Sequence, residues 1–181
     1  GADLPFYQKN IFSDTKRYDF YSNGKSFRDF PLLEALSVPY KFFVLASDKK
    51  DTDTISYKLR VSDTENVALC CQSRVMFIPV CKSAHGIVGL TSVADALALG
   101  MPILISDSAH IGIEVEELGI GMEYKAGDKS DCEKKMDLIL HDENFYSMSQ
   151  KAKSFGEKYD YTAFSMKIQN LLRIALEEKT K

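Results

Sequence analysis

The chain has 181 residues, which is enough for one domain with a full hydrophobic core and too few for two ordinary enzyme domains. Hydrophobic residues make up 45% and charged residues 27%, which argues against intrinsic disorder. The net charge is −3 and the 23 Lys and Arg are scattered along the chain, so nucleic acid is not expected as a partner.

Cysteine spacing and hydropathy restrict the class of protein further. The four cysteines form no CxxC pair and have no zinc-like spacing to the three histidines, so we expect free thiols in a reducing cytoplasm and no bound metal. No apolar run approaches the roughly 18 residues of a membrane helix, and the first residues lack the charged-then-apolar pattern of a signal peptide, so neither is expected. The chain begins without methionine, so we expect it to be a piece of a longer polypeptide.

Hydrophobic periodicity predicts short apolar strands that alternate with helices. Strands are expected at residues 18–22, 41–47, 54–61, 75–80, 101–106 and 120–128, and helices at 28–36, 62–74, 91–100 and 109–119. Ser62 is a candidate N-cap and Gly100 a candidate helix stop. Beyond residue 129 the pattern is helical throughout, and residues 142–181 form extra C-terminal helices.

This alternation predicts an α/β fold, a Rossmann-like three-layer sandwich with a parallel sheet, as a single domain over residues 1–181. Ligands of such sheets bind outside the carboxyl ends of the strands. The loops that follow strands are therefore the ones to examine for function, at residues 22–29, 47–53, 61–65, 80–92 and 106–112.

The first of these loops, SNGKSFRD, combines a tight turn with two positive charges. Gly24 permits the turn, and the amides at the start of the following helix can bind an anion. Lys25 and Arg28 lie within one turn of that position, so a diphosphate would fit. The alternative is a solvated turn with a surface Lys and Arg, because Asn-Gly turns are common.

A second loop, SAHGIVGLTSVAD, leads into a helix. Gly89 precedes the helix, and the hydroxyls and amides of Thr91 and Ser92 could meet a second edge of the same phosphate. Asp95 lies one turn further on the same face, where a carboxylate can accept hydrogen bonds from two vicinal ribose hydroxyls. The alternative for Asp95 is an exposed acid on the solvent side of an amphipathic helix.

His85 lies in the same loop. Its imidazole could contact a phosphate or a sugar hydroxyl, which makes it the one candidate catalytic residue of the chain. The alternative is a surface or packed histidine without a role.

Taken together, several segments resemble the C-terminal, nucleotide-sugar-binding domain of GT-B glycosyltransferases of the group 1 type. These are YSNGKSFRDFPLLEAL, VMFIPV with the loop after it, GLTSVADALALGMPILIS and GIGMEYKAGD. The resemblance extends over residues 18–178, and its most specific element is the pattern G-x-TS-x-x-(D/E)-A-x-A-x-G-x-P-(I/V).

The resemblance implies roles for individual residues. Asp95 would bind the ribose hydroxyls of the donor, and the base would lie near Arg60 and Val61. The diphosphate would be bound on one side by Gly24, Lys25 and Arg28, and on the other by Gly89, Leu90, Thr91 and Ser92, mainly through backbone amides. Two residues depart from the family pattern: Ile87 stands where many retaining members carry a glutamate, with His85 beside it, and Asp95 stands where glutamate is commoner.

The function implied is donor binding in a cytoplasmic glycosyltransferase that transfers a sugar from a UDP- or GDP-sugar to a glycan, lipid-linked or small acceptor. No cofactor and no obligatory metal are expected. The N-terminal acceptor domain is absent from this chain, so we expect nucleotide-sugar binding with little or no transfer. Peripheral membrane association of the full-length enzyme stays open. Two alternatives also remain: a GT-B-like nucleotide-sugar 2-epimerase or hydrolase, and a non-enzymatic Rossmann-like association module.

Overall fold

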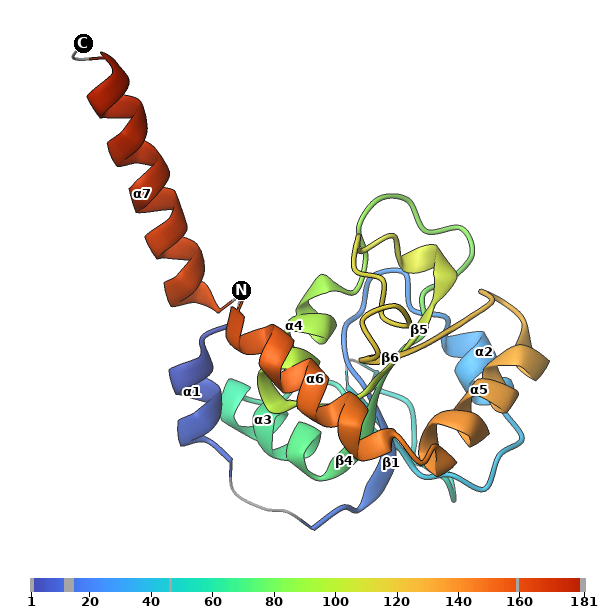
Figure 1. Ribbon diagram of the computed structural model, residues 1–181. Helices are drawn as coiled ribbons and strands as arrows, with labels where there is room; N and C mark the ends of the chain where they lie inside the picture. The colour runs from blue at the N-terminus through green and yellow to red at the C-terminus, as the bar shows by residue number, and fades with distance from the viewer. Residues whose placement is uncertain (1, 12–14, 46, 159, 180–181) are drawn as a thin grey trace.

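A twisted parallel sheet lies at the centre of the protein, and helices cover both of its faces (Figure 1). The computed structural model describes residues 2–11, 15–45, 47–158 and 160–179. The strands of this part are β1 (Tyr18–Ser22), β2 (Phe42–Leu45), β3 (Ile55–Lys58), β4 (Ser73–Ile78), β5 (Ile103–Ser106) and β6 (Gly121–Tyr124). The helices are α1 (Leu4–Lys9), α2 (Phe30–Ala35), α3 (Asp63–Cys71), α4 (Leu90–Leu99), the 3-10 turn η1 (Asp107–Ala109), α5 (Lys129–His141), α6 (Phe145–Lys158) and α7 (Tyr161–Lys179).

The strand order is β3-β2-β1-β4-β5-β6, and every neighbouring pair is parallel. Phe20 of β1 lies opposite Phe42 of β2 on one side and Val75 of β4 on the other. All four residues of β5 are buried, as expected of a strand that helices cover on both faces. The predicted Rossmann-like α/β sandwich is therefore confirmed.

Each face of the sheet has its own hydrophobic core. One core joins the sheet to α3, α4 and α6, through residues such as Cys70, Val93 and Ala152. The opposite core joins it to α2 and α5, through Leu33 and Met136. The chain thus leaves β1 toward one face and β4 toward the other, which opens a crevice between the carboxyl ends of these two strands.

Both predicted helix boundaries are confirmed. Ser62 is the N-cap of α3, and its hydroxyl accepts a hydrogen bond from the Glu65 amide. Gly100 follows α4 in the left-handed conformation, with φ of 65°, which a residue without a Cβ adopts at little cost.

The helix predicted over residues 109–119 was wrong. His110 and Gly112 both have positive φ, 48° and 67°, which interrupts a right-handed helix at its start. Only a single turn follows, in which the Leu118 amide donates to the Glu114 carbonyl at 3.0 Å. Val115 is fully buried within this segment, so its apolar residues pack on the core without helical periodicity.

α1 was not predicted from the sequence. Asp3 caps it by accepting from the Phe6 amide, and α1 packs beside α4. The carbonyl of Ala2, just ahead of the helix, accepts a hydrogen bond from the amide of Tyr161 at 2.9 Å, at the start of α7. The N-terminal segment therefore contacts both the body of the domain and the base of its last helix.

α7 projects from the body as an isolated helix (Figure 1). Large apolar side chains along it are exposed: Tyr161, Met166, Ile168, Leu171 and Ile174. None of the helices in the described part of the chain combines the length and apolar character needed to cross a bilayer.

Burial predicts a clear order of cysteine reactivity. Cys70, Cys71 and Cys132 are buried, whereas Cys81 is half-buried. Burial also raises the pKa of the Cys132 thiol to about 12, so its reactive thiolate is scarce at neutral pH. In native protein treated with N-ethylmaleimide, mass spectrometry should find Cys81 labelled first, and the other three only as the fold opens. Equal labelling rates for Cys81 and Cys132 would contradict this structure.

Candidate functional site

The loops after β1 and β4, residues 23–29 and 79–89, meet at the crevice between these strands. Backbone hydrogen bonds join them: the Asp29 amide donates to the Pro79 carbonyl at 2.8 Å, and the Cys81 amide donates to the Phe27 carbonyl at 2.8 Å. The two loops selected from the sequence therefore form one continuous surface.

A pocket of about 360 Å³ opens between these loops. It is lined by Gly24, Lys25, Ser26, Phe27, Arg28, His85, Ile87, Val88, Gly89, Leu90 and Thr91. It brings together the residues predicted in the first loop and most of those predicted in the second. Val61, Ser92 and Asp95 do not line it.

Arg28 is the most unusual residue of this pocket, because its side chain is buried, with 8% of the residue exposed. Its Nε donates to the Asn23 carbonyl at 2.9 Å, one Nη donates to the Ser26 carbonyl at 3.3 Å, and the other donates to the Ser92 hydroxyl at 2.9 Å. Ser92, predicted as a phosphate neighbour, is thus a buried support for Arg28.

The positive charge of Arg28 has no carboxylate partner among the described residues. Burial accordingly lowers the pKa of the guanidinium from its usual value. A guanidinium has five N–H groups, and three donate to the protein, which leaves two. An uncompensated cation with unused donors at the edge of a pocket is suited to binding an anion.

Two glycines in left-handed conformations line this pocket, and one of them leaves the space that Arg28 occupies. Gly24 has φ of 93°, and a Cβ there would lie 2.5 Å from Nη2 of Arg28. Gly89 has φ of 91°, and a Cβ there would lie 2.8 Å from the Ile78 side chain. Any larger residue at position 24 would displace the guanidinium, so the glycine and the arginine of the SNGKSFRD loop act as a unit.

The N-terminus of α4 faces the same pocket. Its N-cap is Gly89, which offers no side-chain acceptor to the first amides of the helix, and Leu90 and Thr91 line the pocket. Free amides and the helix dipole favour an anion at this position. The side chains of Lys25 and His85 lie exposed at the pocket mouth and can add positive charge or donors.

Ile87 lies at the mouth of the pocket with 66% of its surface exposed. No acidic side chain lines the pocket here. His85 also lines this edge, which agrees with its expected position beside Ile87.

Asp95 lies one helical turn beyond Thr91, outside the pocket, and it is half-buried. Its Oδ2 accepts from the Asn23 amide group at 2.7 Å and from the Asn66 amide group at 3.2 Å. Its Oδ1 accepts from the Tyr7 hydroxyl of α1. Asp95 is therefore not a solvent-facing acid, and in this conformation protein side chains occupy most of its hydrogen-bonding positions.

Val61, the predicted base neighbour, is half-buried and packs against the core on the α3 and α4 face. It follows β3, two strands away from the crevice. The structure does not bring it into the pocket with the other candidates.

Three residues at this site were missed in the sequence analysis: Tyr7, Asn23 and Asn66. Asn23 had a local signal in the sequence, because it directly precedes Gly24. In the structure Asn23 is buried, and its Oδ1 has no hydrogen-bond partner among the described residues, which is uncommon for a buried oxygen. Tyr7 and Asn66 had no local signal, since they meet Asp95 only through the packing of α1 and α3 beside α4.

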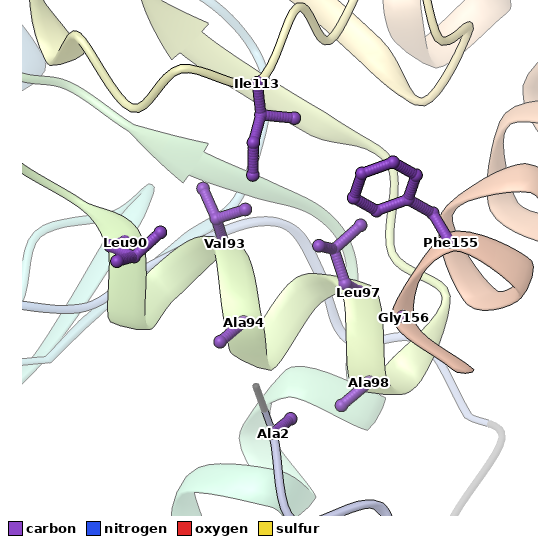
Figure 2. A pocket seen from close by; sticks show the side chains of 9 residues that line it. All are labelled: Ala2, Leu90, Val93, Ala94, Leu97, Ala98, Ile113, Phe155 and Gly156. Carbon is purple, nitrogen blue, oxygen red and sulfur yellow. The ribbon is translucent and has the colours of Figure 1, made fainter. Parts of the chain in front are cut away.

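A second cavity, of about 140 Å³, lies between α4 and α6 (Figure 2). Leu97, Ile113 and Phe155 point into it, with small residues such as Ala98 at its rim. It has no charged side chain, so it lacks the groups that would bind a phosphate. No group of His, Cys, Asp or Glu in the described ranges is arranged to hold a metal ion.

No protein-family model matches the sequence, and no curated protein sequence matches it. Solved structures do match the fold. Sucrose-phosphate synthase from Thermosynechococcus elongatus has a TM-score of 0.69 at 14% identity, over 97% of this chain and 49% of the other. WaaG, a glycosyltransferase involved in lipopolysaccharide biosynthesis, has a TM-score of 0.58 at 12% identity, over 87% and 47%. The spinosyn forosaminyltransferase SpnP has a TM-score of 0.58 at 12% identity, over 88% and 45%.

These structures are GT-B glycosyltransferases. The chain has the fold of a GT-B glycosyltransferase domain. It spans about half the length of each of these GT-B structures. The expected GT-B resemblance is therefore confirmed in three dimensions, where sequence comparison alone finds nothing.

Proposed function

We propose that this chain is the donor-binding, C-terminal domain of a GT-B glycosyltransferase, which transfers a sugar from a nucleoside diphosphate sugar to a glycan, lipid-linked or small acceptor. The observation that carries the proposal is Arg28, a buried guanidinium without a carboxylate partner among the described residues, at the β1–β4 crevice. An anionic ligand would compensate its charge. A UDP- or GDP-sugar supplies a diphosphate of that chemistry.

In the proposed complex, the diphosphate lies in the pocket between the two loops. Arg28 and Lys25 approach it from the first loop, and the amides of Leu90 and Thr91 from α4. As the glycosidic bond to the donor breaks, negative charge grows on the departing diphosphate, and these fixed donors stabilise it without reorganising. His85 at the mouth is the remaining candidate for direct contact with the sugar.

The acceptor and part of the catalytic machinery would come from the other half of the polypeptide. The exposed apolar side chains of α7 offer a surface for that half. This domain alone should then bind donor but transfer little, because holding donor and acceptor together supplies much of the rate. We propose that the enzyme acts in the cytoplasm. Any peripheral association with a membrane would be a property of the full-length protein.

A thermal-shift screen of UDP, GDP, ADP and their sugars tests the donor site directly. At a ligand concentration 100 times the Kd, binding stabilises the folded state by about 2.7 kcal/mol, which raises the melting temperature by several degrees. A flat response to all nucleotides would reject the donor site and favour a non-enzymatic module.

Replacing Asp95 by alanine should weaken the binding of UDP or GDP at least about tenfold, or about 1.4 kcal/mol, because the ribose hydroxyls lose a charged acceptor. Isothermal titration measures this change. Pyrophosphate, which has no ribose, should bind the variant as it binds wild type. Unchanged nucleotide affinity would remove Asp95 from the donor site.

A further inference from the structure

The Asp95 carboxylate has nearly all of its hydrogen-bonding capacity filled by the protein itself. A carboxylate has about four acceptor positions, two on each oxygen. Asn23 and Asn66 fill both positions on Oδ2, and Tyr7 fills one on Oδ1. No other described residue donates to Asp95, so one position on Oδ1 remains.

Two vicinal ribose hydroxyls need two acceptor positions if both are to bind Asp95. The bonds on Oδ2 come from side chains that are firmly placed. Asn23 is 8% exposed, and the Asn66 amide oxygen accepts from the hydroxyl of Tyr21, a fully buried residue, at 2.6 Å. The remaining bond, to Oδ1, comes from Tyr7 and therefore depends on α1 alone.

α1 is the least firmly held of the three elements around Asp95. It has six residues, of which only Leu4 is buried, and a helix of this length is not stable without its contacts. The phenol of Tyr7 is only half-buried. Burial and the neighbouring carboxylate raise the pKa of the phenol, so it stays protonated and donates to Asp95 at all ordinary pH values.

We propose that the Tyr7 hydroxyl occupies, in the ligand-free protein, the position on Asp95 of one ribose hydroxyl, and that a bound nucleotide displaces it together with α1. The proposal rests on the donor site described above. α1 then acts as an internal competitor for that site, and the apparent affinity for nucleotide is the intrinsic affinity multiplied by the fraction of molecules in which Tyr7 has released Asp95.

The test compares wild type with Tyr7→Phe, which keeps the ring and removes the competing hydroxyl. By isothermal titration we expect the variant to bind the best of UDP, GDP and ADP about five- to tenfold more tightly. The 2′-deoxy form of that nucleotide has one ribose hydroxyl and fits the remaining position, so its affinity should not change. Pyrophosphate has no ribose and should not respond either. Tyr146→Phe, an exposed tyrosine on α6, is the matched control.

Hydrogen exchange of the wild-type protein provides a second measurement. Amides of α1, such as those of Phe6 and Tyr7, should exchange faster when the nucleotide is bound. A merely structural Tyr7 predicts slower or unchanged exchange.

The outcomes separate the two proposals. If wild type binds nucleotide and Tyr7→Phe binds it equally or more weakly, competition by Tyr7 is wrong and the donor site stands. An equal gain for nucleotide, its 2′-deoxy form and pyrophosphate also overturns competition at the ribose position. If neither protein binds UDP, GDP or ADP, the proposed function fails, and the role of Tyr7 fails with it.

Discussion

Replacing Arg28 by glutamine is expected to weaken binding of the nucleoside diphosphate about a hundredfold. Glutamine can keep a hydrogen bond to the loop carbonyls but removes the charge and the two unused N–H groups. Hydrogen bonds to charged groups contribute about 1.5–3 kcal/mol each, and a hundredfold change corresponds to about 2.7 kcal/mol. Isothermal titration with UDP and GDP measures the loss, and pyrophosphate should show the same loss, because the charge acts on the diphosphate.

Arg17→Gln is the matched control. Arg17 is exposed and immediately precedes β1, so it lies at the amino ends of the strands, whereas the pocket lies at their carboxyl ends. Its replacement should leave nucleotide affinity within about twofold of wild type, whereas the same result for Arg28→Gln would exclude Arg28 from anion binding. The melting temperature of ligand-free Arg28→Gln should fall, because glutamine cannot replace all three hydrogen bonds of the buried guanidinium, so the affinities are compared at a temperature at which both proteins are folded.

Replacing Gly156 by alanine is expected to destabilise the fold by about 2 kcal/mol. In an exposed helix interior, Gly to Ala stabilises by about 1 kcal/mol, because alanine loses less backbone entropy. At position 156 the new Cβ would lie 2.5 Å from the carbonyl oxygen of Leu97, a backbone atom of α4 that cannot rotate away. The helices α4 and α6 must then separate, and overpacking of this kind costs about 1–3 kcal/mol. A cost at the upper end of this range, as expected for a clash with backbone, less the gain of about 1 kcal/mol, leaves a net loss of about 2 kcal/mol.

Urea denaturation measures this change as a lower midpoint with an unaltered slope. Ser154→Ala is the control, since Ser154 is exposed two residues earlier on the same helix and should gain slightly in stability. If Gly156→Ala proved as stable as Ser154→Ala, the close approach of α6 to α4 would be wrong.

The strands were predictable because they are short apolar runs or alternate apolar and polar residues, and because polar or turn residues bound them. MPILIS, for example, contains β5, and all four residues of that strand are buried. The parallel order then placed the loops after β1 and β4 at one crevice. The prediction from local sequence was wrong at residues 109–119. The apolar spacing there suggested a helix, but positive φ values at His110 and Gly112 prevent one.

The candidate anion pocket was also predictable in outline. Gly24, Lys25 and Arg28 lie within five residues of one another, and Gly89 stands at the start of the helix that follows another strand, so each half was visible in its own loop. The rule that ligands bind at the carboxyl ends of parallel strands placed both halves at the same end of the sheet. Whether Arg28 was a surface residue or a buried cation could not be decided from spacing, because its burial depends on Ser92, 64 residues further along the chain.

The α/β class, the loops that follow strands and the residue types that suit a nucleoside diphosphate could be inferred from the sequence, because these depend on neighbours along the chain. The environment of Asp95 could not be inferred in this way and is seen only in the folded protein. Tyr7 and Asn23 reach it across 88 and 72 residues, from α1 and from the loop after β1. Contacts over such separations follow from how helices pack on the sheet, and no periodicity within one segment encodes them.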